Sequence, residues 1–395
     1  MTSAGTGRTA VVIASRLFVP EVSAGAFRLG ALARGLTDAA ASVTVVTTVP
    51  PQHAPATPDP AGVSVSRWPV LRDSGGNVRG YLQYASFDVP LLLRLIFRRW
   101  SLAVAESPPT TGLVVAMAAA VRRRPFAYYA ADVWTDGVKS MGASSAVVEV
   151  MRRMERAVLR RAAVTLSISD EVTDRLVALG ADRERVVVVG NGIDTDVFAP
   201  GVAPAADERY FVYTGTMSEW QRPEIFVRAF AAIAQEHPDV RLRFFGQGAV
   251  ERDLRSLAEQ LVPGRVVFGG VVSPAESASW IRGATAALVS IAPGIGYDFA
   301  RPTKTYAAAA CGTPVLFTGA RSGRELVADA ELGEAVEFET DAVADAMRRL
   351  LDAEASGETE RRRPERAAWA LAHVSLAAVG QRAAEAVLSA LSRRP

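Results

Sequence analysis

Two cations and a proline stand together where the sequence predicts the start of a helix. A loop over residues 293–300 leads into Arg301, Pro302, Thr303 and Lys304. Proline suits the first helical position because its missing N–H has no partner to lose there. The free N–H groups of a first turn, the helix dipole and two cationic side chains would together bind an anion. An ordinary helix start with two solvated cations fits the same residues, and the segment alone does not separate these two interpretations.

The composition describes a globular chain and removes several classes of protein. Its 395 residues are 49% hydrophobic and 22% charged, and a formal net charge of only +2 argues against a nucleic-acid partner. The single cysteine, Cys311, excludes an intrachain disulfide. The three histidines are scattered, so we expect neither a metal site nor a catalytic triad, and no cofactor. Lys139 and Lys304 are the only lysines among 44 basic residues, which makes Lys304 worth examining.

The elements that must position these residues follow an alternating pattern. Short apolar runs alternate with longer helical stretches, which is typical of parallel sheets covered by helices. The predicted strands of the first half are residues 11–14, 43–46, 113–115, 126–129, 164–167 and 186–189, with a helix over 26–36. Those of the second half are 210–213, 242–245, 266–268, 287–290 and 315–317, with helices over 224–236, 250–261 and 303–311.

A proline-containing linker over residues 199–204 separates the two series and suits a hinge. We therefore predict an α/β fold of two doubly wound domains, residues 1–200 and 201–395. Ligands of such sheets bind at the carboxyl ends of the strands, so the cleft between the domains is the expected site. The helices beyond Trp369 can cross back to the first domain.

Several segments bear on membrane or metal binding. No apolar run reaches the length of a membrane span or a signal peptide, so we expect a cytoplasmic protein. Residues 91–100 favour a half-buried helix over an interfacial patch, and the arginines between residues 152 and 161 favour a solvated helix face. In both segments a peripheral membrane contact is the alternative, and for the arginines a phosphorylated acceptor is another. Residues 194–196, Asp-Thr-Asp, resemble a metal-binding motif but lie in a turn, so turn chemistry is expected.

The predicted helix start resembles a segment of the family 4 retaining glycosyltransferases. Residues 302–306, Pro-Thr-Lys-Thr-Tyr, and 310–315, Ala-Cys-Gly-Thr-Pro-Val, are similar to that family's "PSKxYEYxAxGxPV" segment. Further segments resemble the family in the same order: residues 20–28, 132–134, 191–198, 213–215 and 245–248. Each is weak singly, but their order and spacing together are specific. The resemblance implies the GT-B fold, in which an acceptor-binding and a donor-binding Rossmann-like domain face a central cleft.

The resemblance also implies a reaction and a set of site residues. The reaction is transfer of a sugar from an activated diphosphate donor, a sugar nucleotide in most of the family, to a hydroxylated acceptor such as a natural product or surface glycan. It implies retention at the anomeric carbon, without a metal. Lys304 would stabilise the leaving diphosphate, assisted by Arg301 or Arg222. Asp132 would act as a general acid–base or bind a donor hydroxyl. The alternative for Asp132 is a structural role, as a buried aspartate that caps a helix. The other implied donor-binding residues are Gly25, where backbone could approach the donor closely, Asn191, Gly215, Asp298 and Thr303.

The sequence departs from the family pattern at the nucleoside. The glutamate that holds the ribose hydroxyls in the family falls on Ala307, and its upstream partner falls on Phe299, beside Asp298. The usual arginine and lysine after the first glycine of the second domain fall on Thr216 and Gln221. The diphosphate site is therefore kept while the nucleoside site is altered. A donor such as phosphoribosyl diphosphate would suit this pattern, and a sugar-nucleotide 2-epimerase or a non-catalytic relative is a further alternative.

Overall fold

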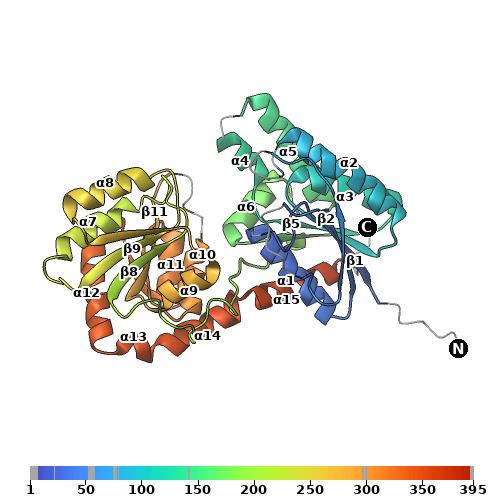
Figure 1. Ribbon diagram of the computed structural model, residues 1–395. Coiled ribbons are helices and arrows are strands. Elements are labelled where there is room, and N and C mark those ends of the chain that lie inside the picture. Colours follow the sequence, from blue (N-terminus) through green and yellow to red (C-terminus); the bar gives the residue numbers. More distant parts are fainter. Residues whose placement is uncertain are drawn as a thin grey trace. The chain divides into compact units, whose positions relative to one another are not determined.

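The computed structural model describes residues 8–21, 23–51, 58–73, 78, 80–140, 143–295, 298 and 301–391. The chain divides into two compact units (Figure 1). The first comprises Met1–Asn191 together with Leu376–Pro395, and the second comprises Gly192–Ser375. Within the described residues, no helix is both long and apolar enough to cross a membrane.

The first unit is built on a seven-stranded parallel sheet in the order β3-β2-β1-β4-β5-β6-β7. Its strands are β1 Ala10–Ala14, β2 Ser42–Thr48, β3 Val63–Trp68, β4 Leu102–Glu106, β5 Phe126–Ala130, β6 Val164–Ser167 and β7 Val186–Val188. The central strands β4, β5 and β6 are buried along their whole length, because helices cover both faces.

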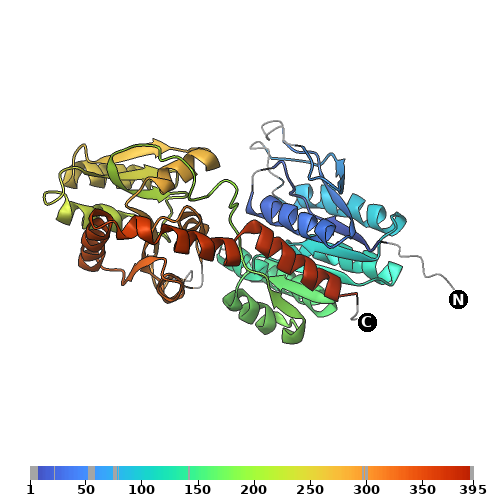
Figure 2. The ribbon, with the colours of Figure 1, turned by 90° about the horizontal axis from the view of Figure 1, so that it is seen from below.

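Helices α1 (Ala24–Asp38) and α15 (Leu376–Ser389) cover one face of this sheet. The two helices pack backbone against backbone where each carries a glycine. A Cβ at Gly35 would lie only 2.5 Å from the Gly380 carbonyl oxygen, and one at Gly380 would lie only 2.4 Å from the Ala31 carbonyl oxygen. The last helix of the chain thus lies beside α1 (Figure 2). The other face carries α2 (Tyr81–Phe97), α3 (Pro109–Arg122), α5 (Ser145–Arg161) and α6 (Asp170–Leu179), and the short α4 (Trp134–Ser140) packs on α5.

The second unit has a six-stranded parallel sheet in the order β10-β9-β8-β11-β12-β13. Its strands are β8 Arg209–Thr214, β9 Val240–Phe245, β10 Val266–Gly270, β11 Ala286–Ile291, β12 Val315–Gly319 and β13 Gly333–Val336. One face is covered by α7 (Glu224–Ile233), α8 (Glu251–Leu261) and α12 (Thr340–Ala355), and the other by α9 (Pro274–Arg282), α10 (Thr303–Ala310), α11 (Arg321–Asp329) and α14 (Arg363–His373), which follows α13 (Glu358–Arg361).

Two doubly wound parallel sheets confirm the predicted fold class, with two local corrections. The strand predicted over residues 113–115 is wrong: Leu113, Val114 and Val115 lie inside α3, and the strand is β4. A short apolar run does not distinguish a strand from a buried helical segment by periodicity. The helix predicted over residues 303–311 is confirmed as α10, but Pro302, expected at its first helical position, is instead its N-cap residue with extended backbone.

Candidate functional site

Glycines bring two loops of the second unit into backbone contact at the carboxyl ends of β8 and β9. The Gly215 N–H donates to the Phe245 carbonyl at 2.8 Å. A Cβ at Gly246 would lie 2.0 Å from the Gly215 carbonyl oxygen, and one at Gly248 would lie 2.0 Å from that of Met217. Gly215 and Gly246 also have positive φ angles of 104° and 124°, which side chains disfavour. Only glycine fits these positions, so the two loops hold one fixed arrangement.

Lys304 reaches this arrangement from the first turn of α10. Its Nζ lies 3.7 Å from the centroid of the Tyr213 ring, at the end of β8. A Cβ at Gly215 would lie 3.6 Å from Cε of Lys304 and 3.8 Å from its Nζ. The Tyr213 hydroxyl is engaged elsewhere, at 2.7 Å from Gln221 Oε1 and from the Thr216 carbonyl. The lysine is therefore seated against an aromatic face and a glycine backbone.

The ammonium group of Lys304 is buried without a hydrogen-bond partner. Although the side chain as a whole is half-buried, its Nζ is shielded from solvent, and desolvation lowers the pKa of Lys304 from 10.5 to about 7. Buried polar groups in proteins are nearly always hydrogen-bonded, so an exception calls for an explanation. The helix also leaves the N–H groups of Thr303 and Lys304 without intrahelical acceptors. Both features suit an anionic ligand at this point.

The other residues predicted to bind the donor in this unit differ in exposure and in their contacts. Thr303 is exposed on the first turn of α10, and Arg301 is half-buried just before it. Asp298 accepts a hydrogen bond from the Gly294 N–H at 2.8 Å, so its carboxylate shapes the loop. Residues 296, 297, 299 and 300 of the same loop, including the position Phe299, lie outside the described residues.

Arg222 is exposed, and its recorded contacts are with neighbours other than Lys304. Its backbone is left-handed, with a φ of 48°. Its Nε donates to Glu224 at 3.0 Å, and its guanidinium lies 5.7 Å from the centroid of the Phe338 ring. The structure therefore brings Lys304 and Gly215 together but does not bring Arg222 to them.

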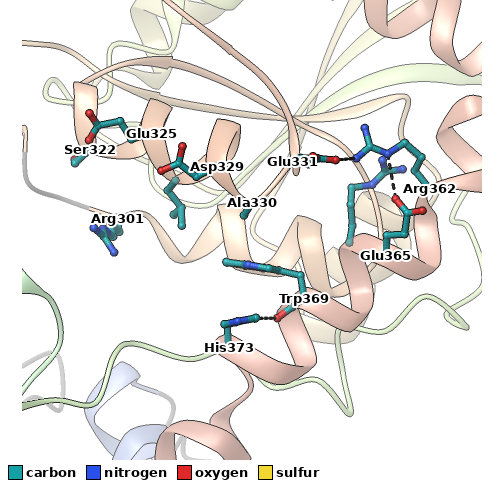
Figure 3. A pocket seen from close by; sticks show the side chains of 12 residues that line it. Arg301, Ser322, Glu325, Asp329, Ala330, Glu331, Arg362, Glu365, Trp369 and His373 are labelled. Atoms are coloured by element: carbon teal, nitrogen blue, oxygen red, sulfur yellow. Dashed lines mark hydrogen bonds and ion pairs between the residues drawn. The ribbon is translucent and has the colours of Figure 1, made fainter.

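A cavity of about 610 Å³ lies between α11 and α14 (Figure 3). Arg301 is at one end, and the stacked rings of Trp369 and His373, with centroids 5.3 Å apart, form part of the wall. Arg362 pairs there with Glu331 and Glu365. Lys304 is not among its lining residues. The cavity is thus a separate feature that shares only Arg301 with the predicted anion site.

In the first unit, a buried carboxylate that sequence reasoning missed underlies the predicted site. Glu106 ends β4 and is 6% exposed. It accepts a hydrogen bond from Ser15 at 2.6 Å, and Arg28 lies 3.7 Å from it. Desolvation raises the pKa of Glu106, and the charge of Arg28 opposes this. A Cβ at Gly25 would lie 2.7 Å from Glu106 Oε1, so Gly25 is needed to accommodate this carboxylate. The sequence signal for this carboxylate is an acidic residue, Glu106, at the end of an otherwise apolar strand.

Asp132 follows β5 and is exposed, so the alternative of a buried capping aspartate is wrong. Glu155, on α5, has that role instead. Its carboxylate accepts hydrogen bonds from the N–H groups of Trp134 and Thr135, both at 2.9 Å, and from the Thr135 hydroxyl at 2.5 Å. Desolvation raises the pKa of Glu155. The first turn of α4 is therefore satisfied from within the protein, whereas Asp132 remains accessible.

The remaining predicted positions lie near the boundary between the units. Asn191 is half-buried beyond β7. Asp194 accepts a hydrogen bond from the Asp196 N–H at 3.0 Å, which is turn chemistry. Among the described residues, no group of three or more His, Cys, Asp and Glu side chains is placed to hold a metal ion. Residues 20–28, which resemble a family loop, include Val22, which lies outside the described residues.

Comparison with known proteins assigns the chain to a class. Residues 24–192 match the family described as "Glycosyl transferase 4-like domain", and residues 208–353 match "Glycosyl transferases group 1". The structure resembles that of Anabaena HepE in complex with UDP and glucose, with a TM-score of 0.66, 17% identity, and coverage of 96% of this chain and 99% of that one. Two Rossmann-like units of this kind define the GT-B glycosyltransferases.

The chain belongs to the family 4-like glycosyltransferases of this class. The D-inositol 3-phosphate glycosyltransferase of Acidothermus cellulolyticus is 31% identical to it over 192 residues, covering 44% of this chain and 42% of the relative. The chain spans about half the length of the curated relatives it matches. The fold is shared more widely: the structure of a putative UDP-N-acetylglucosamine 2-epimerase from Listeria monocytogenes aligns with a TM-score of 0.57, at 14% identity, over 95% of this chain and 94% of that one.

Proposed function

We propose that this glycosyltransferase moves a sugar from a diphosphate donor, a sugar nucleotide, to a hydroxylated acceptor with retention at the anomeric carbon. The observation that carries the proposal is the ammonium group of Lys304, buried against Tyr213 and Gly215 without a hydrogen-bond partner. It stands at the first turn of α10, where N–H groups and the helix dipole add positive potential. A donor diphosphate would supply the anion that this arrangement lacks.

The same arrangement suits the chemistry of the transfer. As the bond between the anomeric carbon and the diphosphate breaks, negative charge grows on the leaving phosphate oxygens. A cation and N–H groups aimed at those oxygens stabilise the transition state more than the ground state. A donor phosphate oxygen can take the acceptor's proton, so no side-chain nucleophile is required. Asp132, exposed beyond β5, is the acceptor-side candidate for binding a sugar hydroxyl.

Loss of the Lys304 ammonium is the direct test. Lys304→Ala should reduce turnover at least about 10²-fold, as removal of one transition-state donor does elsewhere, while the circular dichroism spectrum stays unchanged. Lys139→Ala is the matched control, because Lys139 is the only other lysine and is exposed on α4. Near-normal turnover of Lys304→Ala would remove this residue from the mechanism.

A second donor, phosphoribosyl diphosphate, is favoured by one specific residue. The family resemblance implies a ribose-binding glutamate at the position of Ala307, which is 5% exposed within the apolar cluster behind α10. Ala307→Glu should tighten UDP binding at least about tenfold, because a carboxylate would accept two charge-assisted bonds from the ribose hydroxyls. It should weaken binding of phosphoribosyl diphosphate, since the carboxylate would repel a phosphate.

Calorimetric titration of the unmodified protein and the variant with both ligands decides between the donors. Ala307→Gln is the matched control, since it has the same length without the charge, and melting temperatures without ligand report whether α10 tolerates the change. Submicromolar binding of a UDP-sugar by the unmodified protein would remove phosphoribosyl diphosphate as donor. An epimerase would instead convert the UDP-sugar with no acceptor present, which product analysis detects.

A further inference from the structure

An apolar stripe runs along the outer side of α2 in the first unit. Leu82, Val89, Leu93 and Phe97 are 73%, 67%, 57% and 83% exposed. Spacings of seven, four and four residues place these side chains on one face of the helix. The stripe extends about 22 Å along the helix axis, at 1.5 Å per residue. Large apolar side chains so fully exposed in one row are unusual on a surface that faces only water.

The stripe is additional to the core-facing side of α2. Phe87, Leu91 and Leu95 form that buried side and pack in the cluster beneath the sheet face. The neighbouring helix α3 repeats the arrangement: Val115 is buried, whereas Met117 and Val121 are 49% and 64% exposed. The helices α2 and α3 pack against each other (Figure 1), and we call their exposed sides together the α2–α3 face.

Arginines border the α2–α3 face at one end. Both helices lead into adjacent parallel strands, β4 and β5, so their carboxyl-terminal ends lie at the same edge of the sheet. The two connections hold five arginines, Arg98, Arg99, Arg122, Arg123 and Arg124. No ion pair is recorded for any of the five within the described residues. A cavity of about 680 Å³ at this edge is lined by four arginines, Arg123, Arg124, Arg161 and Arg185, and by two acidic residues, Asp182 and Glu184.

The charge of this region differs from that of the whole chain. Residues 81–124 contain six arginines but only two acidic residues, Asp88 and Glu106, and both acidic side chains are buried. The full chain has 44 basic and 42 acidic residues, so the positive charge is concentrated here. An exposed apolar stripe with an arginine-rich border matches the two layers of a lipid surface, acyl chains and anionic headgroups.

We propose that the α2–α3 face docks on an anionic phospholipid bilayer. The apolar side chains of α2 and α3 enter the boundary between headgroups and acyl chains, while the arginines at the helix ends contact lipid phosphates. Charge favours this occupant over a second copy of the chain. A symmetric dimer would place the same patch, with its arginines, on both sides of the interface, where the like charges repel one another.

The experiment measures co-sedimentation of the full chain with vesicles. Binding to vesicles of phosphatidylglycerol and phosphatidylcholine should exceed binding to pure phosphatidylcholine, and high salt should weaken it. Leu93→Glu combined with Phe97→Glu should reduce binding at least about 100-fold, roughly tenfold for each large apolar side chain withdrawn from the lipid. Arg99→Glu with Arg123→Glu should abolish the preference for phosphatidylglycerol. This readout needs no turnover and is independent of the proposed reaction.

Matched controls keep the result specific to the α2–α3 face. Leu371→Glu changes a leucine of the second unit that is 60% exposed, close to the 57% of Leu93, and should leave vesicle binding unchanged. Equal loss in this control would overturn the proposal, as would binding that is indifferent to lipid charge. Concentration-dependent dimers that Phe97→Glu dissociates, in a protein that ignores vesicles, would assign the face to a second copy instead. Melting temperatures of the variants should match that of the unmodified protein, because every changed side chain is exposed.

Discussion

Replacing Lys304 by methionine should stabilise the ligand-free protein while weakening its binding of a diphosphate. The side chain keeps its length and its contact with the Tyr213 ring, but the buried charge is gone. In the native protein that charge has no hydrogen-bond partner, and desolvation lowers its pKa from 10.5 to about 7. Burial of this charged group destabilises the folded protein, and Lys304→Met removes it.

The size of the effect follows from the pKa and from the aromatic contact. Lowering the pKa by 3.5 corresponds to about 5 kcal/mol at 1.36 kcal/mol per unit. A cation–π contact at 3.7 Å with the Tyr213 ring offsets up to about 2 kcal/mol of this. The remaining ~3 kcal/mol would raise the melting temperature by roughly 6–12 °C for a domain of this size.

The dependence on pH gives the prediction a distinctive sign. Between pH 7 and 10.5 the unfolded chain carries a proton on Lys304 that the folded chain has lost. Stability of the unmodified protein therefore rises with pH through this window. The advantage of Lys304→Met should be fully present below pH 7, shrink as the pH rises, and disappear near pH 10.5.

Thermal unfolding of both proteins across this pH range, without ligand, measures the difference directly. Lys139→Met, at the exposed lysine on α4, should show no such advantage. Equal melting temperatures of Lys304→Met and the unmodified protein at pH 6 would refute the reasoning, as would an advantage that does not change with pH.

Two further predictions concern the donor complex. UDP binding above pH 7 should take up a proton at Lys304, so calorimetric enthalpies should vary with the ionisation enthalpy of the buffer, and in Lys304→Met they should not vary. Catalysis should need no divalent metal, since a lysine and helix N–H groups already face the diphosphate in the proposed complex. Activity lost in a chelator and restored by magnesium or manganese would count decisively against the second prediction.

Residues near one another in the sequence carried most of what could be predicted. Apolar strands and helix starts gave the two parallel sheets, and the segment around Lys304 gave α10 to within one residue. The apolar run at residues 113–115 predicts a strand, but the same three apolar side chains occur in a half-buried helix, and the run lies in α3. The local sequence predicts a helix or strand well when the apolar run is long enough and residues such as proline or glycine stand at both of its ends.

Contacts between distant residues lay beyond the sequence pattern. Lys304 meets Tyr213, Ser15 meets Glu106, and Gly35 meets Gly380, and each pair is brought together by the sheet order or by helix packing. Nothing in the residues flanking Glu106 shows that Gly25 must accommodate it. The role of a glycine in a motif therefore depends on which side chain the fold places against it.

The lowered pKa of Lys304 also explains how the same residue is tolerated in the ligand-free site and can bind the donor diphosphate when it is present. With a pKa near 7, the empty site carries only part of a positive charge at neutral pH, which limits the cost of burying it. A bound diphosphate would raise that pKa, because an adjacent anion favours the charged form. The full cation would then exist only while the donor is present, when the leaving group needs it. The missing hydrogen-bond partner of Lys304 is consistent with a site whose last component is the substrate.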